Sequence, residues 1–101
     1  MDFTWDEKKS EITRRVRGFD FEFATMIFDA ACIVVRDERR DYGEPRSVAI
    51  GVADGITLTV VFTDRIDARG TVVRRIISAR RSNRQERRIH EHATSESAEQ
   101  G

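Results

Sequence analysis

The stretch TVVRRIISARRSNRQERR, from Thr71 to Arg88, sets the organisation of this chain. Its first half, Val72 to Ala79, mixes β-branched residues with Arg74 and Arg75, which predicts a buried strand that carries charge. Its second half predicts an arginine-rich helix from about residue 83 to residue 91. The start of the helix is indicated by Ser82 or Asn83, each followed three residues later by Gln85 or Glu86, which is the spacing of a capping box.

The junction between this strand and this helix, Arg80 to Asn83, is a natural place for an anion. Backbone N–H groups at a helix N-terminus and guanidinium groups both bind phosphate. One interpretation is therefore a phosphate or RNA site. The other is a charged surface helix that follows an edge strand, and the pattern alone does not separate the two.

The rest of the chain predicts further strands and two helices. Asp54-Gly55 predicts a tight hairpin, because an Asp-Gly pair suits the positive φ angles of a two-residue turn. Three consecutive strands joined by short turns predict an antiparallel meander, and the helices that precede it must cover one face of the sheet. The expected strands are residues 2–5, 31–36, 47–52, 56–65 and 72–79, and the expected helices are residues 7–16, 21–28 and 83–91.

The predicted fold is α+β, with two N-terminal helices packed on a twisted antiparallel sheet of about four to five strands and a C-terminal helix. The 101 residues predict a single domain at 1–92, and residues 93–101 lack large apolar side chains and are expected to be disordered. In the last strand two alternating sets compete for the helix-covered face, and a bulge would let both contribute. One set is Val73, Arg75, Ile77 and Ala79; the other is Val72, Arg74, Ile76, Ser78 and Arg80.

The two N-terminal helices differ in apolar content. The first has Ile12 and Val16 as its apolar pair, so we expect it to lie on the surface of the core. The second carries an apolar stripe at helical spacing, which is typical of a core-facing helix. The stripe consists of Phe21, Ala24, Ile27 and Phe28.

Composition narrows the function classes. Hydrophobic residues make up 39% of the chain and fall in patterned runs, which predicts a folded domain. No apolar run approaches the ~20 residues that span a bilayer and no cleavable leader is seen, so we expect a cytoplasmic protein without a membrane partner. Net charge is +0, but Lys8 and Lys9 are the only lysines, so the other sixteen of the 18 basic residues are arginines. Arginine binds phosphate with two parallel hydrogen bonds and stacks on bases, although arginine-favouring codon usage produces the same bias.

The sequence has no Gly-rich phosphate loop, nucleophile elbow or Cys/His cluster. His90 and His92 diverge on a helix and indicate a solvated helix end, and Cys32 indicates a small core residue, so no metal or cofactor is expected. The richer combination is carboxylate plus arginine. Metal-free RNA cleavage needs a base for the ribose 2′-OH, cations for the charge on the phosphorane and an acid for the leaving 5′-oxygen. Glutamate supplies the first, arginine the second, and an arginine, tyrosine or histidine the third.

Several segments resemble the BrnT family, the ribonuclease half of bacterial type II toxin–antitoxin pairs. They are FTWDEKK, GFDFEFA followed by IFD, YGEPR followed by IG, and RIISARRSNRQERR. The resemblance covers residues 3 to about 90, in the right order and with compatible spacing. Its most specific parts are Trp5-Asp6-x-Lys8, Tyr42-Gly43-Glu44-x-Arg46, and Arg75 to Arg80 followed by Glu86-Arg87.

The resemblance implies a fold similar to RelE-type ribonucleases and arrest of translation by cleavage of RNA. It also implies neutralisation by a small BrnA-like antitoxin, a ribbon-helix-helix protein that represses the shared operon. DNA is then reached only through the antitoxin, and a homodimer of the toxin is left open.

By motif position, the resemblance implies that the active residues are Arg80, Arg75, Arg46 and Glu44, with Arg65 at a strand end. In the leading hypothesis, a metal-independent endoribonuclease, the first three hold the scissile phosphate. Glu44 or Glu86 then handles the proton. Trp5 is expected to stack on a base or to pack. The candidate RNA-binding residues are Trp5, Tyr42, Arg74, Arg81 and Arg84.

The chain departs from the family pattern in two places. Arg17 stands where the family often has His, and Ile89 and His90 stand where it commonly has Tyr. If that His is the family's acid or base, this chain is impaired or uses another group. A second hypothesis is a non-catalytic module that binds the antitoxin or nucleic acid. A third, a DNA-binding regulator, lacks helix-turn-helix spacing and an N-terminal ribbon.

Overall fold

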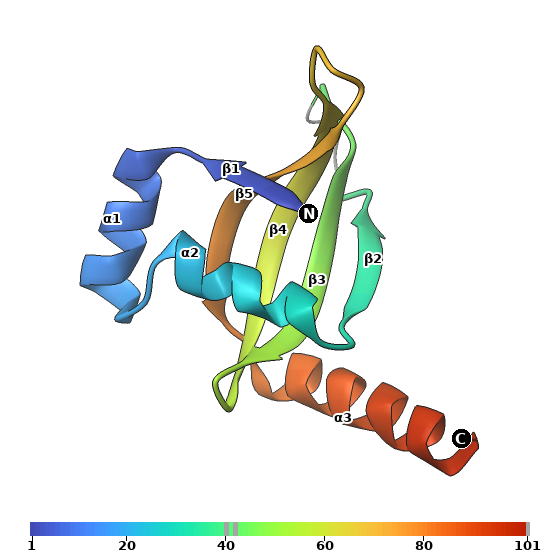
Figure 1. Ribbon diagram of the computed structural model, residues 1–101. Helices are drawn as coiled ribbons and strands as arrows, with labels where there is room; N and C mark the ends of the chain where they lie inside the picture. Colours follow the sequence, from blue (N-terminus) through green and yellow to red (C-terminus); the bar gives the residue numbers. More distant parts are fainter. Residues whose placement is uncertain (40, 42, 101) are drawn as a thin grey trace.

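The structure, a computed structural model, describes residues 1–39, 41 and 43–100. The described residues form one five-stranded sheet with helices around it (Figure 1). The fold is therefore α+β, as predicted. In chain order the elements are β1 (Asp2–Trp5), α1 (Glu7–Arg17), α2 (Phe21–Ala24), the 3-10 helix η1 (Thr25–Asp29), β2 (Ile33–Asp37), β3 (Arg46–Ala53), β4 (Ile56–Ile66), β5 (Val72–Arg81) and α3 (Arg84–Gln100).

The sheet is mixed, with strand order β1-β5-β4-β3-β2. Strands β2 to β5 are antiparallel neighbours, as predicted, and the Asp54-Gly55 hairpin joins β3 to β4 with φ angles of 48° and 78°. Strand β1 instead runs parallel to β5, from Asp2 opposite Val73 to Trp5 opposite Ile76. The prediction of an antiparallel sheet is wrong for this strand. Because most of the chain separates β1 from β5, no local turn fixes their relative direction.

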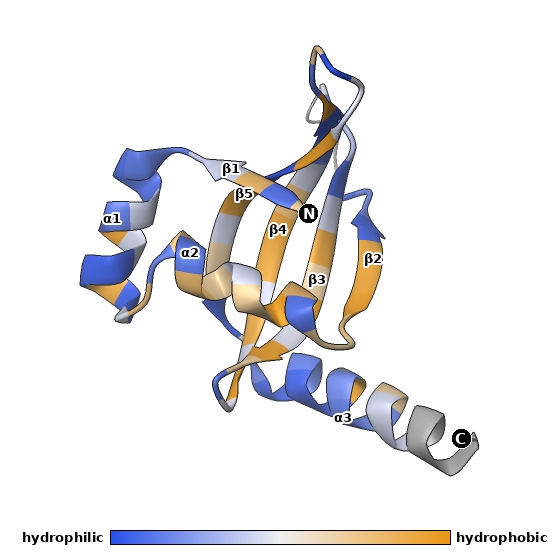
Figure 2. Cartoon of the chain, in the orientation of Figure 1, coloured by the Kyte–Doolittle hydropathy of each residue, from blue (hydrophilic) through white to orange (hydrophobic). Residues whose placement is uncertain are grey.

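The core lies between one face of the sheet and the segment formed by α2 and η1 (Figure 1). The predicted apolar stripe is confirmed, since Phe21, Ala24 and Ile27 are buried and Phe28 packs against them half-buried. Figure 2 shows apolar residues along the strands and mostly hydrophilic residues on α1 and the first turns of α3. The sheet residues of the core are Ala49, Ala53, Leu58, Val60, Phe62, Ile76 and Ala79.

Helix α1 does not cover the sheet face, contrary to the prediction for both N-terminal helices. It contacts β5 and α2, and the side chains of Ile12 and Val16 are 58% and 74% exposed. The helix is attached instead by a buried polar contact, in which the backbone N–H of Phe21 donates to Ser10 Oγ at 3.0 Å. Two apolar residues bury too little surface to hold a helix across a sheet, so this hydrogen bond contributes to the attachment of α1 beside α2 and β5.

A bulge in β5 decides which residues face the core. Val61 of β4 is opposite Ser78, but the next residue, Phe62, is opposite Ile76, so Ile77 is the additional residue. The two alternating sets of the sequence therefore both contribute, as the bulge interpretation allowed. The residues on the α2 side are Arg74 and Ile76 before the bulge and Ala79 and Arg81 after it; Arg75, Ser78 and Arg80 lie on the opposite face.

Helix α3 runs from the end of β5 below the sheet toward β3 (Figure 1). It continues to Gln100, so it is longer than the helix predicted at residues 83–91. Within the described part of the chain, no helix has the length and apolar content to cross a membrane.

We expect Gly51→Ala to destabilise the fold by about 1–3 kcal/mol through overpacking. An alanine Cβ at this position would lie 2.9 Å from the Cβ atoms of both Ile27 and Cys32, so η1 must move away from β3. Urea unfolding measures the loss. The adjacent Val52→Ala, at a side chain that is 37% exposed, is the control and should cost less. A Gly51→Ala protein as stable as wild type would contradict the close approach of η1.

Candidate active site

Four predicted catalytic arginines lie on the sheet face opposite α2, which we call the arginine face: Arg46, Arg65, Arg75 and Arg80. On β4, Thr59 and Thr63 alternate with the core residues and point to this face. Arg80 is opposite Thr59, and Arg75 is opposite Thr63. Arg65 comes two residues after Thr63 on β4, so it points to the same face. Ser47 is opposite Phe62 of the core, so Arg46, which precedes Ser47, points away from the core. The register therefore brings the four guanidinium groups to one side.

Within the arginine face, Arg46 and Arg75 are the closer pair. They lie on either side of Thr63, two strands apart, so their Cα atoms are about 10 Å from each other. Thr63 is buried between them, and its Oγ1 donates to the carbonyl of Pro45 at 2.6 Å. Arg80 is opposite Thr59, four residues from Thr63 along β4, so its Cα atom is about 13 Å from that of Arg75. By backbone spacing, Arg46 and Arg75 are therefore closer to each other than either is to Arg80.

Glu44 lies at the entrance to β3 and contacts two arginines of this face. Its Oε2 accepts a hydrogen bond from Arg65 Nη2 at 2.7 Å, and its Oε1 lies 3.6 Å from Arg46 Nη2. The hydrogen bond from Arg65 is the main cause of a lowered pKa for Glu44, and the charge of Arg46 adds to it. Glu44 is therefore ionised at neutral pH and lies beside the guanidinium groups that attract phosphate.

Arg75 has the least committed guanidinium of the arginine face. Its side chain is half-buried, and across the described residues it forms no ion pair and donates no hydrogen bond. Its charge adds slightly to the lowered pKa of Asp6, which is caused mainly by the backbone N–H groups of Lys9 and Lys8. An arginine held by the sheet without a carboxylate partner is well suited to bind a phosphate.

Arg80, the first of the catalytic residues expected from the sequence, is paired with Glu86. Its Nη1 and Nη2 donate to the two carboxylate oxygens at 2.7 and 2.8 Å. Glu86 also accepts the backbone N–H of Asn83 at 2.8 Å, and its own N–H donates to Asn83 Oδ1, which confirms the predicted capping box. Arg80 lowers the pKa of Glu86 from 4.5 to about 2. The protein's own carboxylate thus occupies the strand–helix junction where the sequence predicted an anion.

Two of the predicted RNA-binding residues, Arg74 and Trp5, lie away from the arginine face. Arg74 is on the α2 side, where it donates to both oxygens of Asp64 at 2.8 and 2.9 Å and lies over the ring of Phe62 at 4.1 Å. Trp5 packs against the core, and its Nε1 donates to Glu7 at 3.0 Å. These contacts give both side chains a packing role.

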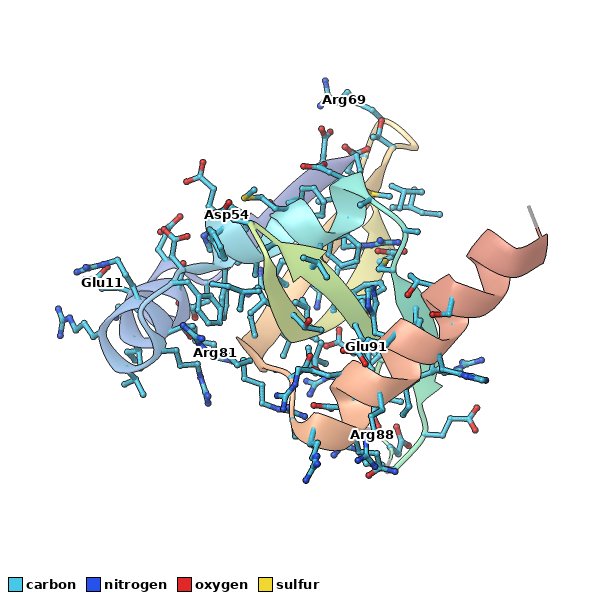
Figure 3. All side chains as sticks on the ribbon, turned by 90° about the horizontal axis from the view of Figure 1, so that it is seen from below. Glu11, Asp54, Arg69, Arg81, Arg88 and Glu91 are labelled. Carbon is cyan, nitrogen blue, oxygen red and sulfur yellow. The ribbon has the colours of Figure 1, made fainter. Side chains whose placement is uncertain are left out.

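Arg81 and Arg84 are exposed and lie near the strand–helix junction. Arg81 lines a pocket with Arg14 on the α1 side of the molecule, far from the labelled Arg88 on α3 (Figure 3). Arg84 is the first residue of α3. Tyr42 lies outside the described residues.

A groove between α1 and β5 contains residues that the sequence reasoning mostly missed. It has a volume of about 410 Å³, and we call it the α1 groove. None of the described residues that line it is a carboxylate. The spacing i, i+4, i+8 on α1 was the available signal, because it places side chains in one stripe. The polar lining consists of Lys9, Thr13 and Arg17 from α1, Arg46 from β3 and Ser78 from β5; Ile12, Phe21, Ile77 and Ala79 complete it.

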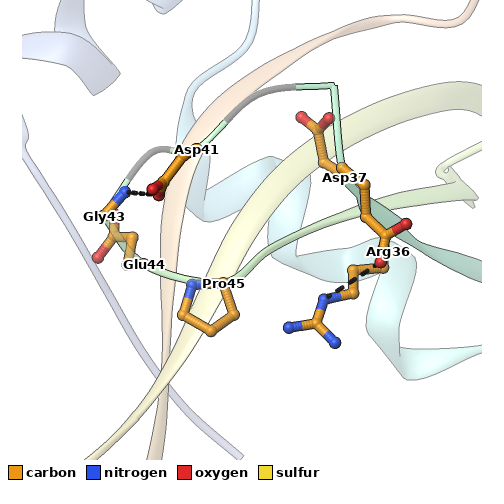
Figure 4. Close-up of a pocket in the computed structure, with 7 residues that line it drawn as sticks. Arg36, Asp37, Asp41, Gly43, Glu44 and Pro45 are labelled. Atoms are coloured by element: carbon orange, nitrogen blue, oxygen red, sulfur yellow. Dashed lines mark hydrogen bonds and ion pairs between the residues drawn. The ribbon is translucent and has the colours of Figure 1, made fainter.

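A second pocket, of about 570 Å³, lies along the loop that delivers Glu44 (Figure 4). Two of its carboxylates, Asp37 and Asp41, accept hydrogen bonds from donors of the same loop. Asp37, whose side chain is 2% exposed, accepts two hydrogen bonds from Arg39 at 2.9 Å, and Asp41 accepts the N–H of Gly43 at 2.8 Å. Among the residues that the structure describes, no three His, Cys, Asp or Glu side chains are grouped closely enough to hold a metal ion.

The chain matches a known family over most of its length. Residues 5–86 match the family described as ribonuclease toxin, BrnT, of type II toxin–antitoxin systems. The chain belongs to the BrnT family. Membership of the BrnT family makes RNA the class of substrate and an antitoxin the partner. No curated protein matches the chain.

The BrnT match includes every part of the site described above. It begins at Trp5 and ends at Glu86, so it spans the α1 groove, the arginine face and the cap of α3. Arg17, where the sequence resemblance implied a departure from the family pattern, lines the α1 groove. A cation at this position adds to the positive charge of the groove at neutral pH, where an unperturbed His is mostly neutral.

Proposed function

We propose that this BrnT-family chain is a metal-independent endoribonuclease that cleaves RNA at a phosphate held between Arg46 and Arg75. The observation that carries the proposal is the uncommitted guanidinium of Arg75 on the same sheet face as Arg46, with Glu44 in contact with Arg46. The family supplies the reaction class, and the arginine face supplies cations at a spacing that suits one phosphate.

In the proposed reaction the ribose 2′-oxygen attacks the adjacent phosphorus and its proton passes to Glu44. Arg46 and Arg75 stabilise the charge that develops on the phosphorane. The bond from phosphorus to the 5′-oxygen then breaks, and the 5′-oxygen takes a proton from water. The hydroxide that remains takes the proton from Glu44, which restores the carboxylate. The products are a 2′,3′-cyclic phosphate and a 5′-hydroxyl. When phosphate binds Arg46, Glu44 loses part of the positive charge that lowers its pKa, so its basicity rises.

The proposed cellular role is arrest of translation in the cytoplasm, reversed by a BrnA-like ribbon-helix-helix antitoxin. The type II toxin–antitoxin family supports this role. Expression of the chain alone should stop growth, and co-expression of the small open reading frame beside it should restore growth. Growth that is unaffected by the chain alone would argue against toxicity.

The decisive experiment incubates purified protein with RNA in the presence of EDTA and maps the cut ends. We expect cleavage to continue in EDTA and to leave 2′,3′-cyclic phosphates. An Arg75→Ala protein purified in parallel excludes a contaminating nuclease, because a contaminant would cut equally in both samples. Cleavage that stops on chelation would overturn the metal-independent route.

A second candidate is a non-catalytic module that binds RNA or the antitoxin. It is favoured by one observation: Arg46, Arg65 and Arg80 each have a carboxylate close by, which reduces the charge available to a transition state. RNA that is bound but never cut, under conditions where the antitoxin also binds, would select this candidate.

A further inference from the structure

We propose that the α1 groove binds the phosphates of a single-stranded RNA segment that continues from the scissile phosphate. The inference rests on the proposed function, because Arg46 belongs both to the arginine face and to the lining of the groove. An RNA strand held at Arg46 can therefore pass directly into the groove.

The basic side chains of α1 differ in whether they form an ion pair. Arg14 and Arg15 both pair with Glu11, at 2.6 and 3.4 Å. Lys9 and Arg17, which line the groove, form no ion pair with any carboxylate in the described ranges. Lys8, outside the groove, also forms no ion pair in the described ranges, whereas Arg14 and Arg15 are both paired. Lys9 and Arg17 are therefore the unpaired cations on the groove side of α1 and are available to an external anion.

The length of the groove suits more than one phosphate. Lys9, Thr13 and Arg17 lie on successive turns of one helix stripe, and the eight steps from Lys9 to Arg17 span about 12 Å. Thr13 and Ser78 place hydroxyl groups on opposite walls, where they can donate to phosphate oxygens. The stripe runs beside β5 and offers a row of contacts to an extended backbone.

The β5 wall of the groove has an open strand edge. Strand β1 pairs with β5 from Val73 to Ile76, so the described residues 77–81 have no strand on that side. Ile12, 58% exposed, adds apolar surface to the groove. An unpaired base has an exposed face that can lie on such a surface, whereas a duplex hides its base faces and presents mainly phosphates. The combination favours a single strand.

The test measures binding of a 2′-O-methyl RNA oligonucleotide by fluorescence anisotropy. This RNA has no free 2′-OH and is not cut, so binding is read separately from catalysis. The Lys9→Ala/Arg17→Ala protein should bind it about tenfold or more weakly, and the slope of log affinity against log salt should fall by about 1.4, near 0.7 for each cation lost. The same RNA annealed to its complement should bind wild type more weakly than the single strand does.

The matched control is Arg14→Ala/Arg15→Ala, which removes the same charge from the same helix outside the groove. It should bind within about twofold of wild type, because both arginines are already paired with Glu11. Equal weakening by both double variants, or none by Lys9→Ala/Arg17→Ala, would overturn the groove. Equal affinity for duplex would overturn the preference for a single strand. If wild type leaves ordinary RNA uncut while Lys9→Ala/Arg17→Ala still loses binding, the nuclease proposal fails and the groove stands.

Discussion

Arg75→Ala is expected to lower the rate of RNA cleavage by about 10²–10³-fold, the usual effect of removing one preorganised charge from a transition state. The fold should stay intact, since the Arg75 guanidinium has no hydrogen bond or ion pair with the described residues. Single-turnover cleavage of RNA in EDTA gives the rate, and urea unfolding gives the stability. The Arg75 side chain is half-buried and held by the sheet. We therefore expect Arg75→Ala to lower the rate of the chemical step more than the affinity for RNA.

Two further variants sharpen this prediction. Arg75→Lys keeps the charge but loses the planar fork, so its rate should lie between those of wild type and Arg75→Ala. Arg69→Ala removes an arginine whose side chain is 84% exposed in the turn before β5, and it should cleave at the wild-type rate. Wild-type cleavage by Arg75→Ala would remove this residue from the mechanism.

Glu86→Ala is expected to destabilise the fold by about 2–4 kcal/mol, from the loss of a helix cap and of hydrogen bonds to a charged partner. The Glu86 side chain is only 17% exposed, and it joins β5 to α3 through Arg80 and Asn83. Thermal and urea unfolding measure the change. Arg88→Ala on the same helix, at an exposed residue, is the control and should be close to wild type. A Glu86→Ala protein of wild-type stability would contradict the structural role of the pair.

The pH dependence of stability tests the same contact. The folded pKa of Glu86 is about 2, below its ordinary value of 4.5, so the stabilisation is fully present above pH 4.5. It is lost as the pH falls from 4.5 toward 2, because the carboxylate must then be protonated. Glu86→Gln cannot titrate, so its stability should fall less steeply than that of wild type across this range. Identical slopes would show that the charge of Glu86 contributes little.

The ion pair between Arg80 and Glu86 affects the interpretation of an Arg80→Ala experiment. Arg80 is the first catalytic residue that we expect from the sequence, but its guanidinium already donates two hydrogen bonds to Glu86. Removal of Arg80 therefore costs stability as well as charge on the arginine face. Cleavage by an Arg80→Ala protein has to be measured at a temperature where unfolding curves show that it is still folded.

Local features were well predicted because they depend on residues a few positions apart. The box of Asn83 and Glu86 caps α3, as the spacing in the sequence predicted. The Asp54-Gly55 hairpin has the expected positive φ angles. Each of these contacts closes within four residues, so the chain has few alternative ways to satisfy the same groups.

The sequence by itself determined the α+β class, the strands of the meander, the caps and the arginine-rich composition of the site. The tertiary structure alone decided the direction of β1, the bulge at Ile77 and the α1 groove. Arg75 and Arg80 are five residues apart, and in a regular strand they would point to opposite faces. The bulge brings them to the same face, and Glu44 reaches Arg65 across 21 positions of sequence. The physical reason is that strand register and pairing depend on the packing of the whole core, which no short segment encodes.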